Sequence, residues 1–200
     1  MNVMRLVGPV LGRLRVGRFR DWYRFTWLKL RQPGTIQAAG LPQLDPGVRI
    51  RTLPGSRLVL GRGVHLASGV SLQLTEGTSL EIGDRVFLNV NCTIGAIGRV
   101  RIGDDCLFGP GVTIVDGNHR FDDLSTLIRD QGHEIRDIEI GSDVWVGASA
   151  TIIASVGDGA VVGANSVVTR PVPARTVVAG TPARVLRQRG ERAQVRAMRA

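Results

Sequence analysis

The chain has 200 residues, which is enough for one domain with a buried core and appended ends. Glycine is frequent at 26 residues, whereas the aromatic side chains are only 5 Phe, 3 Trp and 1 Tyr, which disfavours a helical bundle and favours narrow aliphatic strands joined by tight turns. The net charge of +9 lies at the ends, because residues 1–31 hold seven Arg and one Lys against one Asp, and residues 184–200 hold six Arg against one Glu. The middle of the chain is mildly acidic and lacks the basic face that nucleic acid requires.

The first segment, residues 1–45, combines basic and aromatic side chains. Placed on a helix, it carries an aromatic stripe beside a basic face: Phe19, Trp22, Tyr23, Trp27 and Leu30 beside Arg20, Arg24 and Arg31. Such a stripe suits a helix that lies in a membrane interface, and it predicts peripheral contact of residues 1–31 with an anionic membrane. It also suits a helix that packs on neighbouring β-structure or on another subunit, and both interpretations stay open. Residues 32–47 are expected to form an extended linker.

The sequence predicts a cytoplasmic protein, with attachment to the inner face of the membrane at most peripheral. It has no stretch of 18 apolar residues that would predict a transmembrane helix. Arg5, Arg13 and Arg15 interrupt the apolar core that a signal peptide needs. The two cysteines, Cys92 and Cys106, are expected to be small buried thiols in a reducing compartment.

A unit of six residues repeats through the rest of the chain. It is read in LGRGVH (60–65), LASGVS (66–71), IGDRVF (82–87), IGDDCL (102–107), FGPGVT (108–113), IGSDVW (140–145), VGASAT (146–151), VGDGAV (156–161) and VGANSV (162–167). A period of six is neither helical nor plain strand alternation, so it predicts a short strand followed by a tight corner. Each unit begins with an aliphatic residue, the opener, which is followed by Gly or another small residue. Three units close a triangular coil of about 18 residues, with the openers of successive coils stacked inside. The predicted fold is an all-β parallel β-helix of about five coils over residues 46–183, followed by a basic tail over 184–200.

The register of this repeat is interrupted at several points. It slips between LTEG and IGDRV, at NCTIGAIGRVRIG, and at TIIASVGDG, where the openers Ile152 and Val156 are four residues apart. We expect bulges or loops at corners there. The largest interruption is TIVDGNHRFDDLSTLIRDQGHEIRDIEIG (113–141), which holds two of the three histidines. It predicts a loop over 115–138 that protrudes from the coils.

These motifs resemble a known family, the hexapeptide-repeat proteins with a left-handed parallel β-helix. Residues 89–187 resemble the sugar O-acetyltransferases of the galactoside and maltose acetyltransferase type and their relatives in polysaccharide and lipopolysaccharide synthesis. The matching segments are FLNVNCTIG, FGPGVTIVDGNHRFDD, IRDQG, IEIGSDVWVGASATI, VVGANSVVTRPVPA and VVAGTPARVLR. The resemblance implies a left-handed coil, acetyl-CoA as co-substrate, and a homotrimer with each site between two subunits.

His119 matches the catalytic histidine of that family. A sugar hydroxyl is a weak nucleophile near neutral pH, and a neutral imidazole can take its proton as the oxygen attacks a thioester carbonyl. The same group can return a proton to the leaving thiolate. His133, beyond IRDQG, and His65, in an ordinary corner, are expected to have no role in the chemistry.

The resemblance also implies acceptor contacts. Asn89 matches the asparagine that hydrogen-bonds the sugar, and Asp116 and Asp122 are expected near the acceptor. One carboxylate among Asp116, Asp122 and Asp123 could instead orient the imidazole, and the sequence leaves open which one does. The family's acidic acceptor contact in the following corner has no counterpart in GAIGR (95–99), so the identity of the sugar also stays open.

The resemblance also implies a set of residues that contact coenzyme A: Trp145, Ala148, Ala164, Thr169, Arg170 and Arg187. The backbone N–H of Ala148 is expected to face the developing oxyanion, although many family members have Ser there. The cations of Arg170 and Arg187 suit the phosphates of the coenzyme, and Arg170 keeps the charge of the Lys that is usual in the family.

The predicted function is therefore an acetyl-CoA-dependent O-acetyltransferase that modifies a sugar or glycan in cell-surface polysaccharide biosynthesis. One alternative is an N-acyltransferase that acts on an amino group of a nucleotide-linked sugar, and another is a non-catalytic β-helical scaffold subunit. A β-helical carbonic anhydrase is disfavoured, because His65, His119 and His133 lack the spacing of ligands from near-successive corners. No metal is expected.

Overall fold

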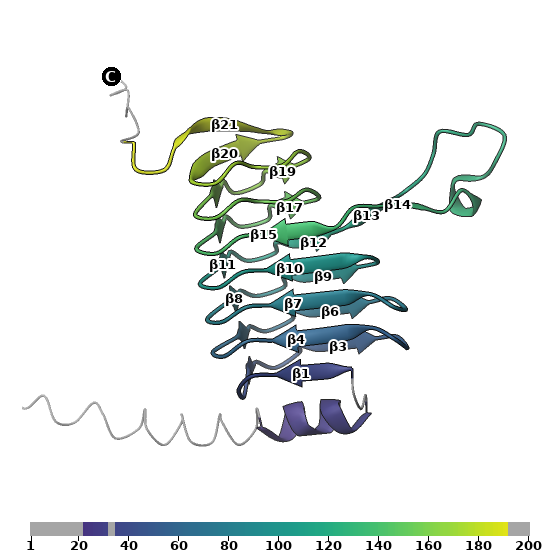
Figure 1. Cartoon of the computed structure of the whole chain (residues 1–200), viewed down its shortest axis with the longest axis vertical. Coiled ribbons are helices and arrows are strands. Elements are labelled where there is room, and N and C mark those ends of the chain that lie inside the picture. Colours follow the sequence, from purple (N-terminus) through teal and green to yellow (C-terminus); the bar gives the residue numbers. More distant parts are fainter. Residues whose placement is uncertain (1–21, 32–34, 192–200) are drawn as a thin grey trace, which may run out of the picture.

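The structure is a computed structural model that describes residues 22–31 and 35–191. It is a stack of triangular coils whose three sides form three parallel sheets (Figure 1). Sheet A contains β1 (Ile36–Ala38), β4 (Arg57–Leu60), β7 (Ser79–Ile82), β10 (Arg99–Ile102) and β15 (Ile138–Ile140). Sheet B contains β2 (Gln43–Leu44), β5 (His65–Leu66), β8 (Phe87–Leu88), β11 (Leu107–Phe108), β16 (Trp145–Val146), β18 (Val161–Val162), β20 (Thr176–Gly180) and the antiparallel β21 (Ala183–Gln188). Sheet C contains β3 (Arg49–Thr52), β6 (Ser71–Leu74), β9 (Thr93–Ala96), β12 (Thr113–Val115), β17 (Thr151–Ile152) and β19 (Val167–Val168).

The core is a set of aliphatic columns that run along the axis of the stack. Leu58 pairs with Leu80, Leu80 with Val100, and Val100 with Ile138, and all four side chains are fully buried. One coil alone cannot enclose such side chains, so burial depends on the coils above and below. The residues that open the predicted units form a similar column, since Leu60 pairs with Ile82 and Ile82 with Ile102, and all three side chains are buried. The predicted inward position of these residues is thereby confirmed.

The length of a coil varies, and the variation lies at one corner. Leu58 to Leu80 spans 22 residues, whereas Val156 pairs with Val172 after only 16. The corner from sheet C to sheet A (the C–A corner) absorbs the difference, shrinking from residues 75–78 to residues 153–155. All three slips of the hexapeptide register fall at this corner, as does the long interruption.

The first coil begins earlier than the sequence predicts. The segment expected to be a linker contains β1 and β2, which pair in parallel with β4 and β5. Ile36 and Leu44 are buried, so two apolar side chains of this segment fill the end of the core. Their spacing does not fit the six-residue unit, which is why the repeat does not reveal them. The prediction of a linker is wrong for this part, and the basic tail beyond residue 191 lies outside the described residues.

The N-terminal helix, described over residues 22–31, covers the end of the first coil (Figure 1). Phe25 is buried and Leu28 packs against the core, while the Arg24 guanidinium donates to the Leu44 carbonyl at 3.1 Å. The described members of the predicted stripe point away from this contact: Trp22, Tyr23, Trp27 and Leu30 are 52, 62, 45 and 76% exposed. The helix therefore packs through a different face from the aromatic one. Phe19 and Arg20 lie outside the described residues.

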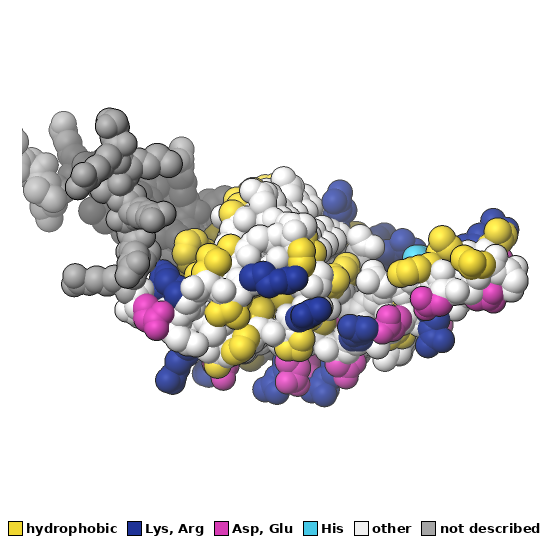
Figure 2. All heavy atoms as spheres, turned by 90° about the horizontal axis from the view of Figure 1, so that it is seen from above, with side chains coloured by type: hydrophobic (Ala, Val, Ile, Leu, Met, Phe, Trp, Pro, Cys, Tyr) yellow, Lys and Arg dark blue, Asp and Glu magenta, His cyan; other side chains and the backbone are white. Residues whose placement is uncertain are grey.

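The long interruption forms an arm, residues 116–137, that projects from the C–A corner (Figure 1). Its base is a two-stranded antiparallel ribbon of β13 (Gly117–His119) and β14 (His133–Ile135), and its far end holds the 3-10 turn η2 (Ile128–Asp130). Seen along the stack, the arm extends well beyond the body and shows apolar side chains among charged ones (Figure 2). Five of its apolar side chains are more than half exposed: Phe121, Leu124, Leu127, Ile128 and Ile135.

Candidate active site

The arm is braced at its base by a buried carboxylate. Asp116 is 2% exposed, and its two oxygens accept hydrogen bonds from the backbone N–H groups of Ile97 at 2.8 Å and Gly98 at 2.9 Å. Two glycines allow the arm and the corner to approach each other closely. A Cβ on Gly98 would clash with the Ile135 side chain at 2.5 Å, and a Cβ on Gly117 would clash with the Ile97 side chain. These contacts fix the direction in which the ribbon leaves the coil.

The far end of the arm is folded by Asp123. Its carboxylate accepts hydrogen bonds from the Ser125 N–H and hydroxyl at 2.8 and 2.6 Å and from the Thr126 hydroxyl at 2.7 Å. These bonds stabilise the charged form and lower the pKa of Asp123 to about 2. The side-chain amide of Gln131 closes the turn: its oxygen accepts a hydrogen bond from the Asp123 N–H, and its nitrogen donates to the carbonyls of Asp123 and Thr126. Asp123 therefore shapes the arm, while Asp122 is exposed beside it.

His119 lies on the ribbon in ring contact with His133. The two residues are direct partners in the antiparallel register, and their ring centroids are 4.3 Å apart with an interplanar angle of 40°. Both residues are exposed. Among the described residues, no hydrogen-bond partner is found for either imidazole. The sequence alone does not predict this pairing, because the two histidines are 14 positions apart in a segment without a repeat.

The other predicted acceptor residue, Asn89, begins the corner from sheet B to sheet C (the B–C corner) of an earlier coil. Its side-chain oxygen accepts a hydrogen bond from the Val90 N–H at 2.7 Å, so its amide nitrogen is the group that can donate outward. His119 follows the opposite end of sheet C. Within one chain, the two predicted residues therefore stand at different corners of the coil.

Three of the predicted coenzyme A residues, Trp145, Ala148 and Ala164, lie at or beside the B–C corner of two later coils. Ala148 and Ala164 occupy the second position of this corner, and a Cβ on Gly147 would lie 2.5 Å from the Ala164 nitrogen. At the equivalent position of the corner from sheet A to sheet B (the A–B corner), the Ser142 N–H donates to the Asp158 carboxylate of the next coil at 2.7 Å. The B–C corner has alanine in place of that carboxylate. Within the described part of the chain, the N–H groups of Ala148 and Ala164 are consequently left without an acceptor.

These two free amides are the feature of the structure that best fits coenzyme A. Pantetheine is a narrow chain with amide groups, and a corner of small residues with unpaired N–H donors can approach it closely. Trp145 lies two residues before Gly147, on the outer side of sheet B, and its side chain is 56% exposed. These three predicted coenzyme A residues are therefore close together in the fold and accessible.

The other predicted coenzyme A residues, Thr169, Arg170 and Arg187, are more widely spread. Thr169 lines a small hollow of about 90 Å³ at the C–A corner, together with Asp116 and Asn118 at the base of the arm. Arg170 is exposed at the same corner. Arg187 lies instead on β21 at the end of sheet B, where its guanidinium donates to the backbone carbonyls of Gln188 at 3.2 Å and Glu191 at 2.5 Å. One chain thus does not bring Arg170 and Arg187 together.

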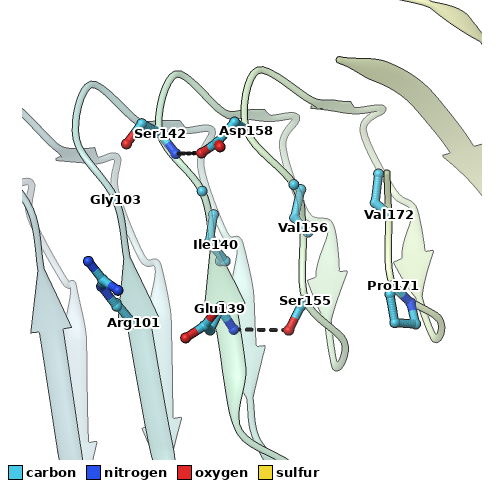
Figure 3. Close-up of a pocket in the computed structure, with 12 residues that line it drawn as sticks. Arg101, Gly103, Glu139, Ile140, Ser142, Ser155, Val156, Asp158, Pro171 and Val172 are labelled. Atoms are coloured by element: carbon cyan, nitrogen blue, oxygen red, sulfur yellow. Dashed lines mark hydrogen bonds between the residues drawn. The ribbon is translucent and has the colours of Figure 1, made fainter. Parts of the chain in front are cut away.

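A larger hollow of about 390 Å³ lies over sheet A of the later coils (Figure 3). Its polar groups include Arg101, Glu139, Ser155 and Asp158. Several of these groups are occupied by coil-to-coil bonds, such as the Glu139 N–H that donates to the Ser155 hydroxyl at 3.0 Å. None of the predicted site residues lines this hollow, so we do not assign the chemistry to it.

Metal ligands and thiols are the other groups that could support catalysis. In residues 22–31 and 35–191, no group of three His, Cys, Asp or Glu side chains is arranged to hold a metal ion. Cys92 and Cys106 are buried free thiols, and burial raises the pKa of Cys106 to about 11. Both thiols donate to backbone carbonyls of a neighbouring corner, Cys92 to Gly109 at 3.2 Å and Cys106 to Gly141 at 3.0 Å. They are parts of the core. No described helix is long and apolar enough to cross a membrane.

Comparisons with known proteins agree with the fold. A family model for the hexapeptide repeat of succinyl-transferase matches residues 99–117 and 137–170. A probable acetyltransferase of Mycobacterium tuberculosis is 33% identical over 179 residues, which cover 86% of this chain and 59% of that protein. The galactoside O-acetyltransferase of Escherichia coli is 35% identical over 120 residues, which cover 55% of this chain and 54% of that protein.

A solved maltose O-acetyltransferase of Clostridium difficile superposes with a TM-score of 0.56 at 26% identity, covering 77% of this chain and 71% of that one. The chain spans between about half and three fifths of the length of the two curated relatives. The chain is a left-handed parallel β-helix of hexapeptide repeats, similar to acetyltransferases across the coils that hold the candidate site.

Proposed function

We propose that this protein is an acetyl-CoA-dependent O-acetyltransferase that modifies a hydroxyl of a sugar or glycan. The observation that carries the proposal is an exposed imidazole, His119, presented on a braced arm of a β-helix whose B–C corner holds two unpaired amides. The similarity to a galactoside and a maltose O-acetyltransferase favours a sugar acceptor. Cell-surface polysaccharide assembly on the cytoplasmic face is the setting that we propose.

The mechanism is a direct acyl transfer. The neutral imidazole of His119 takes the proton of the acceptor hydroxyl while that oxygen attacks the thioester carbonyl. The Ala148 N–H donates a hydrogen bond to the oxyanion of the tetrahedral intermediate. The carbon–sulfur bond then breaks, and the thiolate of coenzyme A receives the proton from the His119 imidazolium. Asn89 holds the acceptor, and Asp122 is an exposed carboxylate of the arm that can accept a hydrogen bond from a sugar hydroxyl.

The other predicted acceptor and coenzyme A residues have supporting roles in this proposal. Asp116 uses both oxygens on Ile97 and Gly98, so it acts on the acceptor only through the position of the arm. Trp145, Ala164 and Thr169 line the path of the pantetheine chain. Arg170 and Arg187 neutralise the phosphates, each from its own side of the coil.

We further propose a homotrimer in which each site is shared by two subunits. In one chain, His119 and Asn89 stand at different corners, and Arg170 and Arg187 lie on different sides. An arm that crosses to a neighbouring subunit would bring His119 of one copy to the B–C corner of the next. The exposed apolar side chains of the arm, and the exposed Leu107 and Trp145 on sheet B, supply surfaces that such contacts would cover.

The N-terminal helix supports the proposal of peripheral membrane contact. Its aromatic face remains exposed although the helix packs on the first coil, and the Arg31 guanidinium lies 4.1 Å from the centre of the Trp27 ring. Aromatic and cationic side chains on one exposed face suit the headgroup region of an anionic membrane. A homotrimer would present three such helices at the same end of the stack.

Assays of acetyl transfer from acetyl-CoA test the main proposal. The purified protein is offered a panel of glycans with free hydroxyls and a matched panel of amino sugars, including nucleotide-linked ones. Ester formation on a hydroxyl, located by mass spectrometry and nuclear magnetic resonance, is the expected result. Amide formation alone would replace this proposal with the N-acyltransferase alternative, and transfer to neither panel would favour a scaffold.

A further inference from the structure

The strands of the arm place His119 and His133 at the position where cross-strand side chains come closest. The Arg136 N–H donates to the Asp116 carbonyl at 2.8 Å, and the Arg120 N–H donates to the Gly132 carbonyl at 3.0 Å. In an antiparallel pair, such hydrogen-bonded partners alternate with non-hydrogen-bonded partners, whose side chains are nearer to each other. His119 and His133 are one residue away from a bonded pair, so they occupy a non-hydrogen-bonded position.

The two imidazole rings are in contact. Their centroids are 4.3 Å apart and tilted by 40°, which is direct packing of one imidazole on the other. The ribbon that carries them is fixed to the coil through Asp116, so the position of His133 is defined by the same base as that of His119. The contact therefore limits the rotamers open to the His119 ring.

A general base normally needs another group to orient it, and a carboxylate often serves. Most carboxylates of the arm are engaged elsewhere: Asp116 with backbone N–H groups, Asp123 with Ser125 and Thr126, Asp130 with the Arg129 guanidinium, and Glu134 with the Arg136 guanidinium at 3.0 Å. Asp137, at the base of the arm, is exposed and makes no bond to His119 among the described residues. Asp122 is exposed, and no bond between it and His119 is found in the described part of the chain. The ring of His133 is the group that actually touches the base.

The geometry points to His133 as a positioning residue that holds the His119 imidazole through ring packing. This inference rests on the proposed function, in which His119 is the general base. His133 does not touch the reacting atoms. Its ring keeps the His119 nitrogen directed to one place, and the loss of such positioning is expected to lower the rate of the chemical step while leaving substrate binding in place.

Three substitutions separate ring packing from other roles. His133→Leu removes the ring but keeps an apolar side chain, and we expect kcat to fall about 10- to 100-fold with the KM for acetyl-CoA unchanged. His133→Phe keeps a ring without a titratable nitrogen, and kcat should return to within about threefold of the wild type. His65→Ala is the matched control, because His65 packs on Phe87 at 4.9 Å with the same 40° tilt but lies on β5, away from the arm.

An activity-free measurement keeps this inference distinct from the proposed function. Nuclear magnetic resonance of the histidine side chains should show a contact between the ring protons of His119 and His133, and a changed, averaged His119 signal in His133→Leu. A wild-type kcat in His133→Leu, equal impairment in His133→Phe, or an unaltered His119 signal would each overturn the positioning role. If the wild type transfers no acetyl group to any acceptor, the proposed function fails, and the His119 signals still decide whether His133 positions that ring.

Discussion

At the residue scale, His119 is exposed on the arm, where its ring packs on His133 rather than in the core, so its removal separates chemistry from folding. His119→Ala should lower turnover by about two to four orders of magnitude, which is the usual contribution of a general base. The thermal unfolding midpoint should stay that of the wild type. A well-folded His119→Ala protein that retains most of its transfer rate would show that another group takes the proton.

The phosphate contacts give a second residue-scale prediction. Arg170→Glu and Arg187→Glu each place a carboxylate where we propose the phosphates of coenzyme A. Both should raise the KM for acetyl-CoA more than the KM for the sugar, because ground-state and transition-state binding weaken together. Steady-state kinetics with each substrate varied in turn measure this. If both variants keep the wild-type KM for acetyl-CoA, the coenzyme follows another path.

The third residue-scale prediction concerns the B–C corner. Ala148 leaves its own N–H free, and the stacked Ala164 has no side-chain acceptor for it. Ala148→Ser should keep or modestly raise kcat, since a hydroxyl can add a second hydrogen bond to the oxyanion. The comparison is kcat at saturating acetyl-CoA. A large loss would mean that the pocket has no room for one oxygen, or that the free amide does not face the thioester.

At the element scale, the corners show how glycine permits close stacking. A Cβ on Gly61 would lie 2.4 to 2.6 Å from backbone atoms of Gly83 and Asp84 in the next coil, and backbone cannot yield as a side-chain end can. A Cβ on Gly95 would lie 3.4 Å from a methyl group of Val115. The two glycines therefore look alike in sequence but differ in what a side chain would meet.

Gly61→Ala should accordingly lower the free energy of unfolding by about 1–3 kcal/mol, the usual cost of overpacking. Gly95→Ala is the control, and it should change stability far less. Denaturant unfolding followed by circular dichroism measures both. Equal stabilities for the two variants would show that the coils can separate slightly at a corner at little cost.

The arm is an element whose shape depends on Asp123. Since the pKa of Asp123 is lowered to about 2 in the folded protein, its contribution is present above the ordinary carboxyl pKa and is lost as pH falls through about 2. The turn at the end of the arm should therefore be unchanged across the neutral range. Any pH dependence of activity near neutrality must arise from other groups.

At the scale of the whole molecule, the helix at the start of the stack has two distinct faces. Phe25 packs on the first coil, so removing the entire segment would expose Ile36 and Leu44 as well as abolish any membrane contact. Substitutions on the exposed face alone test membrane contact without disturbing the packing of Phe25. In the full-length protein, Trp27→Gln combined with Leu30→Gln should weaken sedimentation with anionic vesicles and leave stability unchanged.

The wild-type protein should not sediment with neutral vesicles, and salt should reduce its sedimentation with anionic ones. Each basic residue near an anionic surface contributes about 1 kcal/mol to binding, and dissolved ions screen this attraction. Leu53→Gln is the control, since it changes an exposed apolar side chain outside the helix. If the double variant sediments like the wild type, the aromatic face has another use, and a change in its oligomeric state would identify that use as a subunit contact.

The sequence by itself determined the type of coil, because a period of six with small residues after each aliphatic opener permits few other structures. It also determined where the arm leaves the stack and which histidine the family signature contains. Tertiary structure alone decided three things. Ile36 and Leu44 join the core outside the repeat, since burial depends on the neighbouring coil rather than on local spacing. Asp116 is buried at the base of the arm, because the corner that it meets is 18 residues earlier in the chain. His133 meets His119 because antiparallel pairing, which sequence distance does not reveal, brings the two rings together.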